Sequence, residues 1–229
     1  MLPILTYHRV GTLAVDHVPT VSKTAFESHM AFLVRGRYHV ISLGDMVEAL
    51  RVGRPLPRRS VVLTFDDGYL GTFTEAAPVL RRFRFCATVF VATSEVSTEG
   101  FLSWDQLRTL SSDGFTVGSH TLHHAFLPSI SLAHARTELV ESKRILETQL
   151  NRPIRLFCYP VGGYTPQVQA IVREAGYEAA CTTNRGLPEK VVDLFALRRI
   201  KMTERDSPMS LWVKLSGHYD LFRRLEPPA

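Results

Sequence analysis

Short runs of β-branched and aromatic residues alternate with stretches of helical apolar spacing along most of the chain. This alternation is typical of βα units around a parallel sheet. Strands are predicted at 4–7 and 61–65, and the second, apolar throughout, has the composition of a strand buried on both faces. Further strands are predicted at 38–42, 86–92, 115–118, 156–159, 178–182 and 195–202.

Capping residues and apolar spacing predict a helix after nearly every strand. Phe26, Met30 and Leu33 recur at helical spacing after Thr24, and Ser103 with Gln106 three residues later predicts a capped start. Other helices are predicted after Ser42 and over 72–83, 131–150, 165–176 and 207–217. Because no repeat or change of composition marks a boundary, we expect one catalytic domain over residues 1–229, an α/β fold of barrel type.

The composition is that of a globular protein, and its length suits one large α/β domain. The chain has 229 residues, of which 45% are hydrophobic and 21% charged. Three cysteines, Cys86, Cys158 and Cys181, form no CxxC pair. This argues against a disulfide scaffold or a cysteine-ligated zinc site, and a reducing compartment fits more easily.

Charge and hydropathy do not predict a nucleic-acid or membrane partner. The 27 basic and 22 acidic residues give a net charge of +5, but the basic residues occur only in short clusters. No apolar run approaches membrane-spanning length. The first nine residues resemble a strand rather than a signal peptide, so we expect a cytoplasmic location unless an export segment precedes this start. The oligomeric state is not predicted.

Asp66 and Asp67 follow the buried strand at 61–65 and are themselves followed by Gly68. Adjacent carboxylates at the end of a buried strand are unfavourable unless a cation or hydrogen bonds use their charge. Gly68 allows a turn that could bring both carboxylates to one cavity in different roles. The alternative is a simple turn in which one aspartate caps the next helix.

His120 and His124 have the i, i+4 spacing that places two imidazoles on one face of a helical turn, whereas His123 does not. With one carboxylate they form the ligand set of a catalytic divalent metal site, for which zinc is the first candidate. If Asp67 is the carboxylate ligand, Asp66 is left beside the water as general base. The other histidines are interpreted as ordinary polar or surface residues: His17, His29, His39, His134 and His218.

A metal that activates water and polarises a carbonyl predicts hydrolysis, which also needs a proton donor for the leaving group. His8 is the candidate acid because it follows the first strand. In a parallel barrel the carboxyl ends of all strands open on one face, the face that also holds Asp66 and His120. The alternative for His8 is a hydrogen-bonded histidine without a chemical role.

The segments 64–68, Thr-Phe-Asp-Asp-Gly, and 120–124, His-Thr-Leu-His-His, resemble the first two motifs of polysaccharide deacetylases. This family is the NodB-homology domain of carbohydrate esterase family four. The resemblance extends from Tyr7-His8 to Ile200. It implies an irregular (β/α) barrel of about seven parallel strands, with Asp66 as base and with Asp67, His120 and His124 as metal ligands.

The segment 157–163 resembles the third motif of the branch that acts on poly-N-acetylglucosamine, which also has a Tyr-His element near its start. Cys158 stands where the usual arginine would be, and Val161 stands in place of the motif's tyrosine. The resemblance implies a substrate and oxyanion site formed by Tyr159, Pro160, Val161 and Gly162, with the Val161 N–H in the oxyanion hole. It also implies that Arg199 positions Asp66, whereas the alternative for Arg199 is an ordinary surface cation.

The sequence therefore predicts a metal-dependent amidase that removes acetate from an N-acetylated amino sugar, with zinc as the expected metal. Trp104 and Tyr159 could stack on sugar rings, although burial is the commoner state of such aromatics. Two alternatives stay open: a related C–N hydrolase acting on a non-sugar amide, and an inactive carbohydrate-binding relative. The expected partner is an N-acetylated carbohydrate, and no nucleic acid.

Overall fold

The structure is a computed structural model that describes residues 2–12, 18–185 and 192–216. Within these residues, seven parallel strands close into a barrel in the order β1-β10-β9-β8-β7-β6-β5, and β1 pairs with β5 to complete it. This confirms the predicted barrel. The strands are β1 Ile4–Tyr7, β5 Ser60–Phe65, β6 Thr88–Val91, β7 Thr116–Ser119, β8 Leu156–Cys158, β9 Ala179–Arg185 and β10 Leu197–Lys201.

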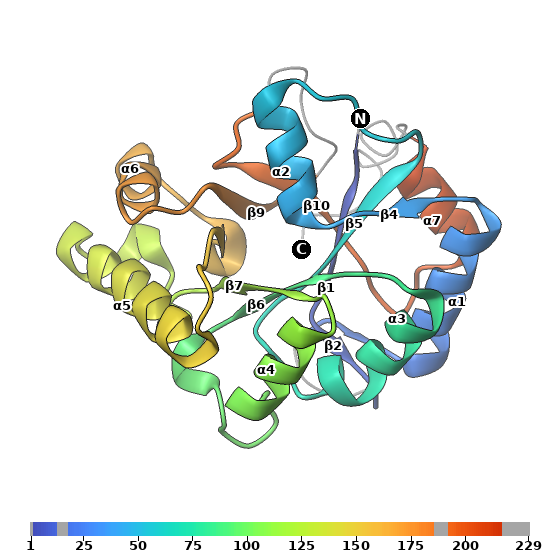
Figure 1. Cartoon of the computed structure of the whole chain (residues 1–229), viewed down its shortest axis with the longest axis horizontal. Coiled ribbons are helices and arrows are strands. Elements are labelled where there is room, and N and C mark those ends of the chain that lie inside the picture. The colour runs from blue at the N-terminus through green and yellow to red at the C-terminus, as the bar shows by residue number, and fades with distance from the viewer. Residues whose placement is uncertain (1, 13–17, 186–191, 217–229) are drawn as a thin grey trace.

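Helices surround the strands, as Figure 1 shows for α1, α3, α4, α5, α6 and α7. Their bounds are α1 Lys23–Arg35, α2 Leu43–Val52, α3 Ala77–Phe83, α4 Trp104–Ser112, α5 Leu132–Leu150, α6 Pro166–Glu174 and α7 Pro208–Leu215. Side chains cap several starts as the sequence predicts. Ser103 and Gln106 form a complete capping box at α4, and Thr165 caps α6 just before its first-turn proline.

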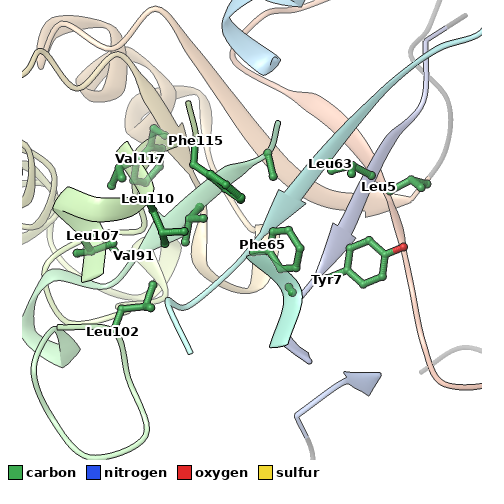
Figure 2. Packing of buried hydrophobic residues seen from close by; sticks show 14 of the residues in the cluster. Leu5, Tyr7, Leu63, Phe65, Val91, Leu102, Leu107, Leu110, Phe115 and Val117 are labelled. Carbon is green, nitrogen blue, oxygen red and sulfur yellow. The ribbon is translucent and has the colours of Figure 1, made fainter. Parts of the chain in front are cut away.

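Alternation along the strands separates two cores, because successive strand side chains point to opposite faces. Outward residues such as Leu63, Phe65 and Val91 pack against the helices, and Figure 2 shows Val91 beside Leu107 and Leu110 of α4. Inward residues fill the barrel in a second cluster: Ile4, Val62, Phe90, Leu156, Cys158, Ala179, Cys181 and Leu197.

Helix α2 closes one end of the barrel. Its buried residues Leu43, Met46 and Val47 belong to the same cluster as the inward side chains at the strand starts, including Ile4 and Val62. Burial of three such side chains contributes several kcal/mol, on the order of 2 kcal/mol each. Because the strands are parallel, their carboxyl ends all lie at the opposite end, which leaves that end for a site.

Three elements differ from the predicted pattern. The extended segment near residue 40 becomes β4 (His39–Val40), which pairs only with the start of β5 and lies outside the closed ring. The strands β2 (Arg9–Val10) and β3 (Thr20–Val21) form a separate two-stranded sheet that sequence patterning did not predict. The predicted helix over 72–83 opens with a π-helical turn, η1 (Thr72–Ala76), and continues as α3.

Three short 3₁₀ turns complete the description: η2 (Thr93–Glu95), η3 (Leu127–Ser129) and η4 (Pro160–Gly162). Two of them, η2 and η4, follow β6 and β8 directly and so lie at the carboxyl end of the barrel. Across the described ranges, none of the helices combines the length and the apolar character needed to cross a bilayer.

Candidate metal centre and active site

Asp66 and Asp67 leave β5 in different directions. Asp66 has the inward parity of Val62 and Thr64 and is 1% exposed, so it lies inside the carboxyl end of the barrel. The turn begins at Asp67, whose φ is +69°, and continues at Gly68, whose φ is +82°. A Cβ at Gly68 would come within 2.9 Å of a Val91 methyl group, so both backbone freedom and space favour glycine there.

Asp67, His120 and His124 come together at this end of the barrel. Asp67 Oδ1 lies 3.3 Å from His120 Nε2 and 3.2 Å from His124 Nε2. One potential ligand atom from each residue falls within 4.8 Å of the others. These residues fit a divalent cation, because two imidazole nitrogens and one carboxylate oxygen, all of them metal-ligand atoms, converge on one point.

The predicted reason for this convergence is wrong. His120 follows β7, but the residues from 120 to 126 form a loop rather than a helical turn. Thr121 and His124 take left-handed φ values of +68° and +54°, which the sequence spacing alone did not predict. The imidazoles therefore meet through an irregular loop and not through one helix face.

Hydrogen bonding prepares His120 as a ligand. Its Nδ1 donates to the backbone carbonyl of Cys158 at 2.7 Å, which fixes one proton on Nδ1 and leaves Nε2 as the nitrogen that would bind a cation once it loses its own proton. Burial alone lowers the pKa of His120, but Cys158 and the Asp67 carboxylate raise it to about 10 in the metal-free protein. Asp67 also raises the pKa of His124, and burial opposes it. A cation bound here would replace the shared proton.

Asp67 itself stays ionised. Burial raises the pKa of its carboxyl, but hydrogen bonds from His120 and His124 hold the pKa well below its usual range. A carboxylate that remains charged when buried is the form that ligates a cation.

Asp66 forms a bidentate ion pair with Arg199 of β10. Arg199 Nη1 donates to Oδ1 at 2.7 Å and Nη2 donates to Oδ2 at 2.6 Å. Burial raises the pKa of Asp66, and the charge and hydrogen bonds of Arg199 outweigh it, so the pKa lies below its usual value. Arg199 is 1% exposed, so its interpretation as a surface cation is wrong. The contact between Asp66 and Arg199 is present.

Cys158 completes the surroundings of this pair. Its Sγ lies 3.0 Å from Arg199 Nη2, and burial raises the pKa of the thiol to about 11, so the sulfur is neutral at neutral pH. The guanidinium of Arg199 also donates to the carbonyl of Thr182 and to Thr64 Oγ1. Every donor group of the buried cation therefore has a partner, as buried charges require.

His8 directly follows β1 and shares the inward parity of Ile4 and Thr6. Its Nδ1 is buried without a hydrogen-bond partner among the described residues. Burial lowers the pKa of His8, against the attraction of the Asp66 and Asp67 carboxylates. His8 therefore lies close enough to both carboxylates for their charges to act on its imidazole.

The segment from Tyr159 to Gly162 lies beyond the end of β8. The Tyr159 ring points outward into the helical core, is fully buried and donates its hydroxyl to the Phe195 carbonyl at 3.1 Å, so it is not free to stack on a sugar. Pro160 and Gly162 are buried, whereas the Val161 side chain is 67% exposed. Val161 has φ of +56°, and Thr183 Oγ1 donates to its carbonyl at 2.8 Å.

Gly162 is required by close packing. Its φ is +78°, and a Cβ there would fall 1.9 Å from Thr183 Oγ1 and 2.3 Å from Thr183 N. Trp104 is half-buried against the outer core at the start of α4, and no contact places it at the metal centre.

Of the remaining histidines, His29 is buried and hydrogen-bonded, whereas His39 and His134 are exposed. His17 and His218 lie outside the described residues. His123 points to Glu138 of α5 rather than to the metal centre, with Nδ1 at 2.7 Å from Glu138 Oε1. Sequence reasoning did not include Glu138 among the site residues.

The described part of the chain also forms a cleft of about 700 Å³, whose lining does not include Asp66, Asp67, His120 or His124. Arg9 and Tyr69, which line it, follow His8 and Gly68 closely in sequence. The Arg9 guanidinium lies over the Tyr69 ring at 4.8 Å, and Phe101 stacks on that ring at 5.0 Å. Both aromatic residues and Glu99 form part of the wall.

A sequence profile described as polysaccharide deacetylase matches residues 53–180, which is more than half of the chain. This span contains Asp66, Asp67, His120 and His124 as well as the segment after β8. The chain belongs to the polysaccharide deacetylase family. The resemblance predicted from the two motifs is therefore confirmed at the level of the family.

Relatives of this deacetylase-family chain include enzymes named for an N-acetylated polymer. The protein YxkH of Bacillus subtilis (strain 168) is 27% identical over 202 residues, covering 88% of this chain and 71% of YxkH. The poly-beta-1,6-N-acetyl-D-glucosamine N-deacetylase of Escherichia coli (strain K12) is 31% identical over 134 residues. That match covers 51% of this chain but only 20% of the Escherichia coli protein.

Solved structures share the whole barrel. The Streptococcus pyogenes deacetylase PplD, determined in complex with acetate, has a TM-score of 0.88 and 26% identity, covering 93% of this chain and 97% of PplD. IcaB from Ammonifex degensii has a TM-score of 0.83 and 25% identity, covering 93% of this chain and 96% of IcaB. The fold of this family member is thus that of known deacetylases.

Proposed function

We propose that this chain is a metal-dependent N-deacetylase that hydrolyses the acetamide group of an N-acetylated amino sugar and releases acetate. The observation that carries the proposal is the meeting of Asp67 with the Nε2 atoms of His120 and His124, next to a separate carboxylate on Asp66. Family membership and the poly-beta-1,6-N-acetyl-D-glucosamine relative support a carbohydrate substrate.

Asp67, His120 and His124 would hold the cation, and we propose zinc because this ligand set is typical of catalytic zinc. When bound, zinc acidifies water and polarises a carbonyl oxygen. Asp66 accepts the proton of the attacking water, and Arg199 keeps its carboxylate ionised and aimed. The Val161 N–H is our candidate donor to the oxygen on which negative charge would develop.

His8 delivers a proton to the departing amine nitrogen. The imidazole is partly exposed just after β1, and in its protonated form it releases its proton readily because burial lowers its pKa. Water attack and amine departure therefore use different residues. The chain forms no covalent bond to the substrate in this scheme.

Three variants test these roles, with folding of each checked by circular dichroism. Asp67→Asn should lose bound zinc, because it removes the anionic ligand. Asp66→Asn should retain zinc while acetate release falls by roughly 10²- to 10⁴-fold, the usual contribution of a general base. His8→Ala should also retain zinc and lower kcat. Zinc is measured by elemental analysis, and acetate with N-acetylated β-1,6-glucosamine oligomers, chitooligosaccharides and nucleotide-linked N-acetyl sugars.

Three outcomes would overturn parts of the proposal. Equal zinc loss in Asp66→Asn and Asp67→Asn would remove the division between base and ligand. Wild-type protein that binds no zinc and releases no acetate from any of these sugars would favour an inactive carbohydrate-binding relative. Acetate released only from non-sugar acetamides would instead support a C–N hydrolase with a different class of substrate. The exposed Val161, which stands in place of the motif's tyrosine, is the feature that favours this alternative.

A further inference from the structure

Glu138 of α5 binds the loop that carries the two histidines. The residue is 9% exposed, and its Oε2 accepts the backbone N–H groups of Leu122 and His123 at 3.0 and 2.8 Å. Oε1 accepts the Nδ1–H of His123 at 2.7 Å. One buried carboxylate therefore makes three hydrogen bonds to two consecutive residues that lie between His120 and His124.

The loop needs such a partner because its backbone is strained on both sides of these residues. Thr121 and His124 have φ values of +68° and +54°, and neither is glycine. Left-handed backbone at residues of this kind costs about 1–3 kcal/mol each and persists only where surrounding contacts fix it. The Glu138 contacts lie between the two strained positions, so they oppose relaxation of His124 away from Asp67.

A second contact of α5, one helical turn further on, fixes the other end of the loop. Ser142 Oγ lies 2.8 Å from Ser119 Oγ and 2.7 Å from Thr93 Oγ1, all of them buried. The Ser94 N–H also donates to the Leu122 carbonyl at 2.8 Å. Ser142 and Ser94 thus hold the start of the loop and the Leu122 carbonyl, whereas Glu138 holds the N–H groups of Leu122 and His123 and the His123 ring.

We propose that Glu138 is a positioning residue of the metal centre, which sets the affinity for the cation by holding His124 in place. The proposal rests on the proposed metal-dependent function. Glu138 touches neither Asp67 nor the two histidine Nε2 atoms, so it acts through the backbone of residues 122–123. Helix α5 packs on the barrel through Ala135, Leu139 and Leu146, so loss of Glu138 leaves the main contacts of the helix intact.

The test compares zinc affinities of metal-free full-length variants, measured by competition with a chromophoric chelator. Glu138→Ala should weaken zinc binding by roughly 10- to 100-fold, the usual effect of removing a group that orients a metal ligand. Glu138→Gln should lose less, because its amide oxygen still accepts both backbone N–H groups. The matched control is Glu141→Ala, since Glu141 lies on the exposed face of α5 and pairs with Arg144.

The Co²⁺ absorption spectrum provides a second readout that a general loss of stability would not change. A displaced His124 should alter its d–d bands in Glu138→Ala and leave them unchanged in Glu141→Ala. If Glu138→Ala does not fold, Glu138→Gln and His123→Ala test the proposal in its place. Each of these two variants should weaken zinc binding by about threefold or more. Wild-type zinc affinity in the folded Glu138 variants would overturn the proposal.

Zinc affinity is measured without substrate, which separates the two proposals. If the wild-type protein binds zinc and Glu138→Ala weakens it, the positioning role stands even where no sugar releases acetate, and only the proposed activity fails. A wild-type protein without zinc affinity would overturn both.

Discussion

Val161 shows how much strain a single residue carries at the end of β8. A β-branched side chain at φ of +56° is unfavourable by about 1–2 kcal/mol, because Cβ approaches the neighbouring carbonyl oxygen. The side chain is 67% exposed, so little burial compensates for this cost. Strain of this kind concentrates at functional sites, which agrees with the proposed use of the Val161 N–H.

Val161→Gly should therefore stabilise the metal-free protein by about 1 kcal/mol, because glycine adopts this backbone conformation without a steric penalty. Urea unfolding followed by circular dichroism measures the change. The matched control is Val140→Gly in the middle of α5, also a partly exposed valine, which should destabilise by about 0.5–1 kcal/mol. A destabilised Val161→Gly protein would show that the side chain makes contacts worth more than the strain.

Residue identities at the site could be predicted from the sequence, but the backbone between them could not. Asp67, His120 and His124 were predicted from residue type and spacing, and they do converge. The helical turn assumed for the histidines is a loop, since its two left-handed residues are stabilised by contacts far along the chain, including Glu138. A glutamate on a helix gives no local sign that its carboxylate is buried against another loop.

At the scale of elements, strand alternation explains most of the site. His8, Asp66, His120 and Arg199 each lie on the inward parity of a barrel strand or its direct extension. The strands themselves were predictable from apolar runs, which is why these residues could be assigned to one face. The burial of Arg199 could not be predicted. Three of the five residues in the strand at 197–201 are basic, and basic side chains are usually exposed to solvent.

Arg199 links four strands, and its removal should show this. It belongs to β10 and donates to Asp66 just after β5, to Thr182 of β9 and to Cys158 of β8. Arg199→Leu leaves the Asp66 carboxylate buried without its partner, so we expect a loss of about 3–5 kcal/mol in the free energy of unfolding. Because Asp66→Asn removes the buried charge, the double variant should lose less than the sum of the two single variants.

Urea unfolding of the wild type, both single variants and the double variant gives the coupling energy directly. We expect a value of about 1–3 kcal/mol, the range for residues in one buried network. Additive losses would mean that the pair contributes nothing beyond its separate side chains, and Arg199 would then not be the group that stabilises Asp66.

At the scale of the whole molecule, His29 of α1 connects β1 to the segment just before α7. His29 Nε2 donates to the Asp206 carbonyl at 2.7 Å, so its Nδ1 accepts the Tyr7 hydroxyl at 3.3 Å. Asp206 in turn forms a 2.6 Å ion pair with Lys214 of α7. Neutral His29 thus connects β1, α1 and the segment before α7, where the barrel closes.

This connection predicts a pH dependence of stability. Burial lowers the pKa of His29 in the folded protein, although the Asp206 carbonyl and carboxylate oppose the shift, Lys214 adds to it and Glu204 opposes it. The unfolded chain, with a pKa of about 6.5, therefore binds more protons than the folded protein just below that pH. Stability from neutral His29 is complete above about pH 6.5 and is lost as the pH falls toward the folded pKa.

His29→Gln should reduce this dependence, because glutamine can donate to the Asp206 carbonyl but does not titrate. The free energy of unfolding of the metal-free protein, measured in urea at pH 7.5, 6.5 and 5.5, should fall more steeply in the wild type. One proton contributes at most about 1.4 kcal/mol per pH unit to the difference. His8, whose pKa burial also lowers, adds a similar slope to both proteins and cancels in the comparison. Parallel curves would show that His29 does not couple protonation to closure of the barrel.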